Sequence, residues 1–314
     1  MILVTGGLGF IGSHAVQALL DRDEECVLVQ RRAAEVPPGR FTRPVQVEQG
    51  DVADLGTLLD IGKRHRITGI VHLAGSMPWP PSDEPAVAAT RRSLGSLLNV
   101  LQAATDWGVQ RVGVASTIGV YFGGAVAGAL REDQPLSMGP GPVIPTFKKI
   151  GELLNGFVAG AAGLDVVNYR ISGTWGPLGH ADPFFAGPAL IHAAAAGEPA
   201  DLSTLYAQPH AEDALDLCYV KDTGRAIALL QTAGTLNHPT YNVASGRPTS
   251  NAEVIAAIKK VVPDAQVDLP VGGEGSDAYL DITRLHEDTG YQPEYDTERA
   301  AAEYIAWLRA GNER

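Results

Sequence analysis

Glycines near the N-terminus have the spacing of a loop that holds the diphosphate of a dinucleotide: Gly6, Gly9 and Gly12. They stand between an apolar run over residues 2–4 and a helix-like pattern over residues 11–20. The first glycine is expected to allow a tight turn, the second to let the backbone approach the diphosphate, and the third to let helix and strand pack closely. N–H groups at the start of the helix, around Phe10 and Ile11, would then bind the phosphates. The spacing is one residue longer at its front than the commonest form, so the position between strand and helix carries the inference.

The elements that must position this loop alternate along the chain. Apolar, strand-like runs occupy residues 2–4, 26–29, 45–47, 69–74, 111–115 and 165–171. Helical periodicity occupies residues 13–21, 54–64, 85–106 and 147–162. This alternation predicts an α/β fold of the Rossmann type, a doubly wound parallel sheet with helices on both faces.

The pattern loosens after Pro177, which favours a division into two parts. We predict a dinucleotide-binding Rossmann domain over residues 1–176, to which residues 218–246 return. A smaller C-terminal lobe, built from residues 177–217 and 247–314, would bind the substrate above the cleft. Residues 182–217 are expected to leave the sheet without regular βα units. The tail is expected to hold two amphipathic helices around a short strand at residues 266–269.

Composition excludes several classes of partner. The net charge is −12 and the basic residues are scattered, so nucleic acid, which needs a concentrated basic face, is not expected. No apolar run approaches the ~20 residues that span a bilayer, so no membrane partner is expected. Cys26 and Cys218 lie in apolar stretches without zinc-like spacing, which predicts buried thiols, no metal and a reducing, cytoplasmic setting. The first strand is expected to start at residue 2, so no signal peptide is expected.

Further segments carry a family resemblance along nearly the whole chain. They are Gly50-Asp51-Val52, Val71-His72-Leu73-Ala74-Gly75, Ala115-Ser116-Thr117-Ile118-Gly119-Val120-Tyr121, and residues 170–177, 219–222, 241–246 and 281–293. In this order they resemble the landmarks of the extended short-chain dehydrogenase/reductase family, also called the NAD-dependent epimerase/dehydratase family. The resemblance implies an enzyme that oxidises or reduces a carbonyl/hydroxyl group of a small or sugar-like substrate with a nicotinamide cofactor.

The resemblance also assigns the cofactor contacts. Beyond the glycine loop, it places these residues at the cofactor: Asp51, Val52, Leu73, Ala74, Gly75, Ser116, Lys148 and Ile171. Gln30 ends the second strand, where NAD-preferring members carry an acidic residue for the ribose hydroxyls, and Arg31 and Arg32 follow it. A guanidinium can grip a 2′-phosphate, so NADP is predicted, with NAD as the alternative. The other interpretation of both arginines is a solvated loop.

The usual acid/base of this family, a Tyr four residues before a Lys, is missing here. Lys148 matches the Lys because Glu152 then falls four residues further on, as in the family pattern. That alignment places Ile144 where the Tyr belongs, and no Tyr lies between Tyr121 and Tyr169. The catalytic candidates that remain are Thr117, Lys148 and Tyr121. Thr117 would hold the substrate oxygen and Lys148 the ribose, while Tyr121 more readily packs beneath the cofactor than reacts.

Three explanations of the missing Tyr stay open. An active enzyme could recruit another proton carrier, because a desolvated Lys can titrate near neutrality. Besides Lys148 and Tyr121, the candidates are His180, His192, Tyr206 and His210. The chain could instead catalyse an isomerisation or lyase step that needs less proton transfer. It could also be a degenerate nucleotide binder that senses the cofactor or supports a partner.

The substrate lobe departs from family members that grip a nucleotide diphosphate with Arg and Asn. Leu215 stands at the Arg position and Gly173 at the Asn position, and each lost charge-assisted bond is worth roughly 1.5–3 kcal/mol. A small hydroxy or keto compound, or an unactivated sugar derivative, is therefore favoured over a sugar nucleotide. Residues 85–106 and 147–162 match the helices that commonly form a four-helix dimer interface, so a homodimer is expected.

Replacing Arg31 tests the cofactor prediction. Arg31→Asp is expected to raise the dissociation constant of NADPH, because a carboxylate repels the 2′-phosphate that a guanidinium attracts. Titration of the purified protein with NADPH and NADH measures the effect, and NADH serves as the control because it lacks the phosphate. An unchanged NADPH affinity would contradict the prediction.

Overall fold

A seven-stranded sheet forms the centre of the protein, with the order β11-β7-β5-β4-β1-β2-β3. The computed structural model describes residues 1–32, 35–75, 84–124, 126–139, 141–180, 184–205, 207–273 and 275–312. The strands are β1 Ile2–Thr5, β2 Cys26–Gln30, β3 Gln46–Gln49, β4 Gly69–His72, β5 Arg111–Thr117, β7 Val166–Ile171 and β11 Thr240–Val243. Every neighbouring pair is parallel, and the order reverses between β1 and β4. The predicted Rossmann-type sheet is confirmed.

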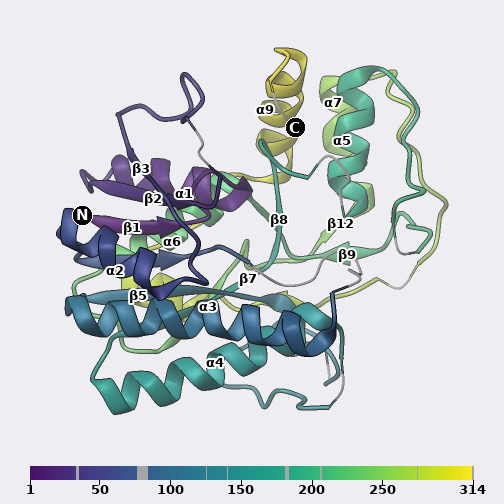
Figure 1. The fold of residues 1–314 in the computed structure, drawn as a ribbon. Coiled ribbons are helices and arrows are strands. Elements are labelled where there is room, and N and C mark those ends of the chain that lie inside the picture. The colour runs from purple at the N-terminus through teal and green to yellow at the C-terminus, as the bar shows by residue number, and fades with distance from the viewer. Residues whose placement is uncertain are drawn as a thin grey trace.

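Helices cover both faces of the sheet because side chains alternate along each strand (Figure 1). On β1, Ile2 and Val4 share a core with α1 (Phe10–Leu20) and α6 (Val220–Thr232). Leu3 faces the other way, into a core with α2 (Leu55–Arg64) and α3 (Ala86–Trp107). The next helix, α4 (Val143–Ala162), packs against α3, β5 and β7. No helix of the described residues is long and apolar enough to cross a membrane.

A second core lies beside the sheet, among α5 (Ala186–Ala196), α7 (Asn251–Val261) and α9 (Thr297–Arg309). Figure 1 shows these helices grouped apart from the sheet, with α5 and α7 side by side. Short strand pairs lie outside the seven-stranded sheet: β8 Gly173–Trp175 with β10 Leu217–Tyr219, β9 Ala214–Leu215 with β12 Thr249–Ser250, and β6 Ala129–Leu130 with β13 Tyr279–Leu280. The division into a Rossmann domain and a substrate lobe at the sequence positions given above stays a prediction.

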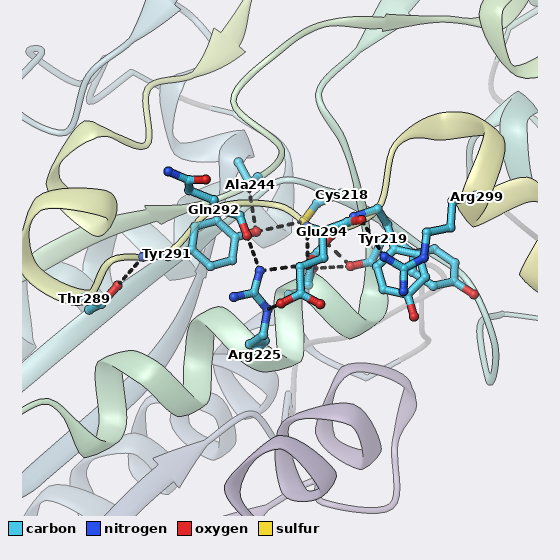
Figure 2. A network of polar contacts seen from close by, with 12 residues as sticks. Cys218, Tyr219, Arg225, Ala244, Thr289, Tyr291, Gln292, Glu294 and Arg299 are labelled. Atoms are coloured by element: carbon cyan, nitrogen blue, oxygen red, sulfur yellow. Dashed lines mark hydrogen bonds and ion pairs between the residues drawn. The ribbon is translucent and has the colours of Figure 1, made fainter. Parts of the chain in front are cut away.

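A polar network fixes the C-terminal segment after α8 (Thr283–Thr289) onto α6 (Figure 2). The Tyr291 hydroxyl donates to the carbonyl of Ala244 at 3.1 Å, and Arg225 stacks 5.0 Å from the centre of the Tyr291 ring. At the start of α6, the carboxylate of Asp222 accepts backbone N–H bonds from Glu294 and Tyr295. These bonds fix the segment that precedes α9 (Thr297–Arg309) against α6.

The structure corrects two of the expected elements. Residues 266–269 form no strand; Val267 is buried in the second core without strand pairing. The described part of segment 182–217 adds no strand to the seven-stranded sheet, as expected, and it contains the apolar helix α5. The helix expected from residue 147 begins at Val143, because Pro145 falls in the first helical turn, where a missing N–H costs no hydrogen bond.

Candidate active site at the carboxyl edge of the sheet

The glycine loop forms a tight turn between β1 and α1. Gly6 has φ +71°, in the left-handed region that glycine adopts readily. The N–H of Gly9 donates to the carbonyl of Gly6 at 3.0 Å. A Cβ at Gly12 would lie 2.0 Å from that same carbonyl oxygen, so only glycine allows this contact between helix and turn. No side chain caps the start of α1, which leaves its N-terminal N–H groups available to an anion.

Polar contacts join β1 to β4 at the point where the strand order reverses. The hydroxyl of Thr5 bonds Nδ1 of His72 at 2.8 Å and accepts the N–H of Ala74 at 3.2 Å. Burial lowers the pKa of His72 to about 3, so its imidazole is neutral. The contacts hold the end of β4, with Leu73, Ala74 and Gly75, beside the glycine turn. Reversal points of this kind are where parallel α/β sheets bind ligands.

The end of β2 carries an unsatisfied polar group. The Gln30 side-chain nitrogen Nε2 is buried and finds no acceptor among the described residues. Arg31 and Arg32 follow it, exposed and without a partner in the described part of the chain. The carboxylate of Asp51 accepts the N–H of Ala53 at 2.9 Å, which folds the turn that also contains the buried Val52. The unsatisfied N–H donor of Gln30 and the two exposed guanidinium groups that follow it could bind the hydroxyl oxygens of a ribose or the oxygens of its 2′-phosphate.

Lys148 reaches the same edge of the sheet from the opposite side. Its Nζ donates to the carbonyl of Ala115 in β5 at 2.6 Å. Burial lowers the pKa of Lys148 to about 8, with Glu152 acting in the other direction. Lys148 lines a cavity of about 50 Å³ together with Ala74 and Gly75 at the end of β4. An amine that titrates near neutrality can both give and take a proton.

The residues near Lys148 that the sequence singled out differ in their hydrogen bonds and in whether they line the cavity. The Thr117 oxygen accepts the N–H of Gly119 at 3.2 Å, so its O–H donor stays available. Lys149 points away from the cavity, and its Nζ donates to the carbonyls of Phe122 and Ser137. Ile144 lies in the first turn of α4 and does not line the cavity. The alignment that pairs Lys148 with Ile144 thus puts the cavity-facing lysine in the family position.

A buried ion pair joins α4 to the sheet next to Lys148. Arg170 of β7 contacts Glu152 of α4, with Nη2 and Oε2 2.8 Å apart, and the hydroxyl of Ser116 donates to the same carboxylate. Arg170 also donates to the Tyr121 hydroxyl at 2.9 Å, and that hydroxyl donates to Oδ1 of Asn242 at 2.8 Å. Burial raises the pKa of Tyr121 to about 12. These bonds occupy the phenol of Tyr121 in the core, which disfavours proton exchange with a ligand in the cleft.

The remaining proton-carrier candidates are dispersed. His180 lines a small aromatic pocket with Phe10 and Phe184, and burial lowers its pKa. His192 bonds the hydroxyl of Tyr304 at 2.7 Å, and His210 lies in a loop beside Asp213. Neither lines the cavity of Lys148 or the aromatic pocket. Tyr206 lies outside the described residues. Among the described residues, no group of three His, Cys, Asp or Glu side chains could hold a metal.

Sequence reasoning missed two features of the site. Asn155 lies two turns after Lys148 on α4 and lines the same cavity, a spacing of seven that could have identified it. Gly173 and Leu215 contact one another: a Cβ at position 173 would lie 2.6 Å from Cδ2 of Leu215. The two departures from the family pattern therefore form one packing arrangement, which only the structure reveals.

Comparisons with known proteins agree with this architecture. A family model described as "NAD dependent epimerase/dehydratase family" matches residues 2–244. The chain is 28% identical to a UDP-glucose 4-epimerase of Azospirillum brasilense, over 94% of this chain and 88% of that protein. It is 29% identical to a dTDP-6-deoxy-L-talose 4-dehydrogenase (NAD(P)(+)) of Kitasatospora kifunensis, over 96% and 93% of the two chains. A solved UDP-glucose 4-epimerase of Bifidobacterium longum, in complex with NAD+ and UDP, shares the fold with a TM-score of 0.80 at 21% identity, covering 98% of both chains.

The lowered pKa of Lys148 predicts a pH-dependent effect of its removal. The folded state holds this proton less tightly than the unfolded chain, so keeping Lys148 charged opposes folding below pH 8 and no longer does so above about 10.5. The stability of Lys148→Met relative to the wild type should therefore be greatest near pH 7 and fall as the pH rises to about 10.5. Urea unfolding of both proteins across this range measures the difference.

Lys149→Met is the control for that experiment, because it removes the neighbouring lysine and leaves Lys148 in place. This variant should be less stable at every pH, since the carbonyls of Phe122 and Ser137 lose their donor. A pH-independent difference between Lys148→Met and the wild type would refute the prediction.

Proposed function

The chain belongs to the NAD dependent epimerase/dehydratase family, and from that premise we propose that it transfers hydride between a nicotinamide cofactor and a carbonyl/hydroxyl group of a small or sugar-like substrate. The match confirms the resemblance seen in the sequence, and the family is one of enzymes. One observation carries the proposal: the glycine turn and Lys148 meet at the same edge of the sheet, on either side of the reversal in strand order.

The residues of this edge suit a dinucleotide. The turn from Gly6 to Gly12 would hold the diphosphate, Gln30 and Arg31 the adenosine ribose, and Lys148 the nicotinamide ribose. The remaining proposed contacts are Phe10, Ile11, Arg32, Asp51, Val52, Leu73, Ala74, Gly75, Ser116 and Ile171. When bound, the nicotinamide supplies or accepts the hydride. The exposed Arg31 and Arg32 support NADP over NAD, and the name of the Kitasatospora relative includes both cofactors.

Lys148 is the proposed proton carrier in place of the missing Tyr. Oxidation of a carbinol releases a hydroxyl proton, and the neutral amine of Lys148 would take it; reduction would reverse the transfer. The pKa of about 8 supports this role, because both forms of the amine are accessible near neutral pH. Thr117 would hold the substrate oxygen through its available O–H. Tyr121 is not proposed as the carrier, because its hydroxyl is already bonded to Arg170 and Asn242.

The proposed substrate is a small hydroxy or keto compound, or an unactivated sugar derivative. The side chain of Leu215 fills the space beside Gly173, so an Asn could not stand at 173 unless Leu215 moved. Neither position offers a donor to a diphosphate. The nearby aromatic pocket, with Phe10, His180 and Phe184, suits a partly apolar ligand.

Ile144 favours a second candidate function, a binder that senses the cofactor or a non-redox isomerase or lyase on the same fold. Activity separates the candidates. The purified protein is first denatured and any released dinucleotide identified by mass spectrometry; turnover is then measured on a panel of carbonyl compounds and alcohols. Reversible NADPH binding with turnover supports the oxidoreductase, whereas tight retention without turnover supports the sensor. Turnover of UDP-glucose or dTDP-glucose would overturn the substrate proposal.

Single substitutions test the proposed roles of Lys148, Thr117 and Ile144 through their effect on activity. Lys148→Ala is expected to lower kcat by roughly 10²–10⁴-fold, the usual contribution of a general acid or base, and Thr117→Ala is expected to weaken activity as well. Ile144→Tyr restores the family residue, and a large gain in reductase activity would mean that only the phenol was missing. Thermal unfolding of each variant checks the fold. Unchanged kcat in Lys148→Ala would remove Lys148 from the mechanism.

We also propose a homodimer through α3 and α4, located in the cytoplasm. Leu153 and Phe157 of α4 are 62% and 73% exposed, and Leu98 of α3 is 45% exposed. Exposed apolar side chains on adjacent helices are typical of an interface. Cys26 and Cys218 are buried free thiols, which is compatible with a reducing compartment.

Light scattering tests the assembly. The wild type should have twice the chain mass of 33.0 kDa at micromolar concentration, and Phe157→Glu should shift it to the monomer by placing a charge in an apolar contact. Val271→Glu is the matched control, because Val271 is 87% exposed in a segment outside both helices. A monomeric wild type would reject the dimer.

A further inference from the structure

A second buried lysine follows Lys148 on α4 and does not line its cavity. Lys149 is 8% exposed, and it forms no ion pair within the part of the chain that the structure describes. A lysine this deeply buried normally has a carboxylate partner, because burial of an uncompensated ammonium is costly. Its Nζ donates instead to two backbone carbonyls, that of Phe122 at 3.4 Å and that of Ser137.

These two carbonyls belong to the two ends of one segment, residues 122–137, which connects the turn after β5 to the residues that lead into α4. Phe122 directly follows the short 3₁₀ helix Ile118–Tyr121. Ser137 meets this turn from the other end of the segment: a Cβ at Gly123 would lie 3.2 Å from the Ser137 Oγ. Lys149 therefore joins the start and the end of segment 122–137 at one point on α4.

The middle of segment 122–137 has anchors of its own. Strand β6 pairs with β13, and Leu130 of β6 is 1% exposed. The carboxylate of Glu132 accepts the N–H of Asn242 at 2.8 Å. Loss of the Lys149 ammonium would therefore release the ends of the segment and leave its centre in place.

The consecutive lysines of α4 bind the chain on either side of Thr117. Lys148 donates to the carbonyl of Ala115, two residues before Thr117. Lys149 donates to the carbonyl of Phe122, five residues after it. The turn that carries Thr117 is thus held against α4 at both ends. The separation between the Thr117 hydroxyl and the Lys148 amine depends on both contacts.

We propose that Lys149 is a positioning residue: it holds the Thr117 turn and the ends of segment 122–137 against α4, so that the Thr117 hydroxyl stays aligned with Lys148. Alignment matters at this scale, because a misplacement of ~1 Å in an active site can cost about 10²-fold in rate. Lys149 acts through Thr117, since it does not line the cavity itself. The effect on turnover rests on the function proposed above; the anchoring of the segment does not.

Two variants disturb this contact from opposite sides. Lys149→Met removes the ammonium from α4 and keeps an apolar chain of similar length. Gly123→Ala acts from the segment, because Gly123 has φ +93°, where alanine is strained, and the new Cβ would crowd the Ser137 hydroxyl.

Each variant has a matched control. Gly124→Ala changes the next glycine, which has no positive φ and whose Cβ would meet the carbonyl of Tyr121 at an ordinary 3.7 Å. Lys63→Met removes an equal charge from α2, where the Lys63 side chain is 76% exposed beside Asp60.

Hydrogen exchange of the protein without substrate or cofactor tests the anchoring. The amide of Phe122 should exchange about tenfold faster in Lys149→Met and in Gly123→Ala, because the ends of the segment lose their attachment to α4. The amide of Asp281, which donates to the carbonyl of Leu130 in the centre, should keep its protection. Unchanged exchange at Phe122 in Lys149→Met would overturn the anchoring, and Gly123→Ala decides the point if that variant does not fold.

Steady-state kinetics on a substrate that the wild type converts tests the positioning. Lys149→Met should lower kcat per NADPH-binding site by about 10–100-fold and leave the dissociation constant of NADPH unchanged. In a Thr117→Ala background the same change should have little further effect, because the group that Lys149 positions is absent. Additive losses, or fewer NADPH sites with an unchanged kcat per site, would show a merely structural role and overturn the positioning.

The two measurements separate this proposal from the proposed function. Turnover in the wild type with an unchanged kcat in Lys149→Met would overturn the positioning and leave the proposed oxidoreductase intact. Absence of turnover in the wild type would count against the proposed function and against the positioning that rests on it, while hydrogen exchange would still decide whether Lys149 anchors the segment.

Discussion

The buried ion pair between Arg170 and Glu152 is the contact on which the arrangement of the cleft depends. Their side chains are only 6% and 10% exposed, so removing either partner would leave an uncompensated charge, typically about 3–5 kcal/mol of lost stability. The pair connects β7 to α4, and the bond from Ser116 adds β5 to the same carboxylate. Lys148 lies one helical turn before Glu152, so its position against Ala115 follows from where this pair fixes α4.

The same network explains the position of Tyr121. Its ring lies 5.0 Å from the Arg170 guanidinium, and its hydroxyl completes the hydrogen bonds of Arg170 and Asn242. A phenol in these contacts stabilises the buried arginine and is withdrawn from the cleft. In the alignment predicted from the sequence, the chain retains the lysine and the Ser/Thr position of the family, whereas Ile144 offers no titratable group. In the proposed function, proton transfer at this edge would then depend on Lys148, whose pKa is lowered by burial.

The substrate side of the cleft shows a similar exchange of polar groups for packing. Leu215 and Gly173 are separated by 42 positions in the sequence, yet the leucine side chain occupies the space that a side chain at 173 would need. Their strands, β8 and β9, lie at the junction between the sheet and the second core. Substitution at one position alone would leave either a clash or a gap, so the two residues are expected to change together.

Local patterns in the sequence were sufficient for the sheet and for the glycine turn. Apolar runs and helical periods are properties of neighbouring residues, and Gly6, Gly9 and Gly12 lie within one turn, so the turn that they form could be predicted directly. The family resemblance added the alignment of Lys148 with Glu152. Helix boundaries were predicted less well. Periodicity placed the start of α4 at residue 147, whereas the helix begins at Val143 and contains Pro145 in its first turn. Helix α5 lacks an amphipathic pattern because it is buried on almost all sides.

Only the tertiary structure decided which polar groups are occupied and which remain available. Tyr121 and Lys148 are both titratable residues near the predicted site, but one is bonded in the core and the other faces a cavity. The place of Asn155 in that cavity and the contact between Gly173 and Leu215 depend on residues from separate elements. The sequence by itself determined the fold and the glycine turn, because those follow from local order. The availability of each group was decided by packing, because hydrogen-bond partners and burial are set by residues distant along the chain.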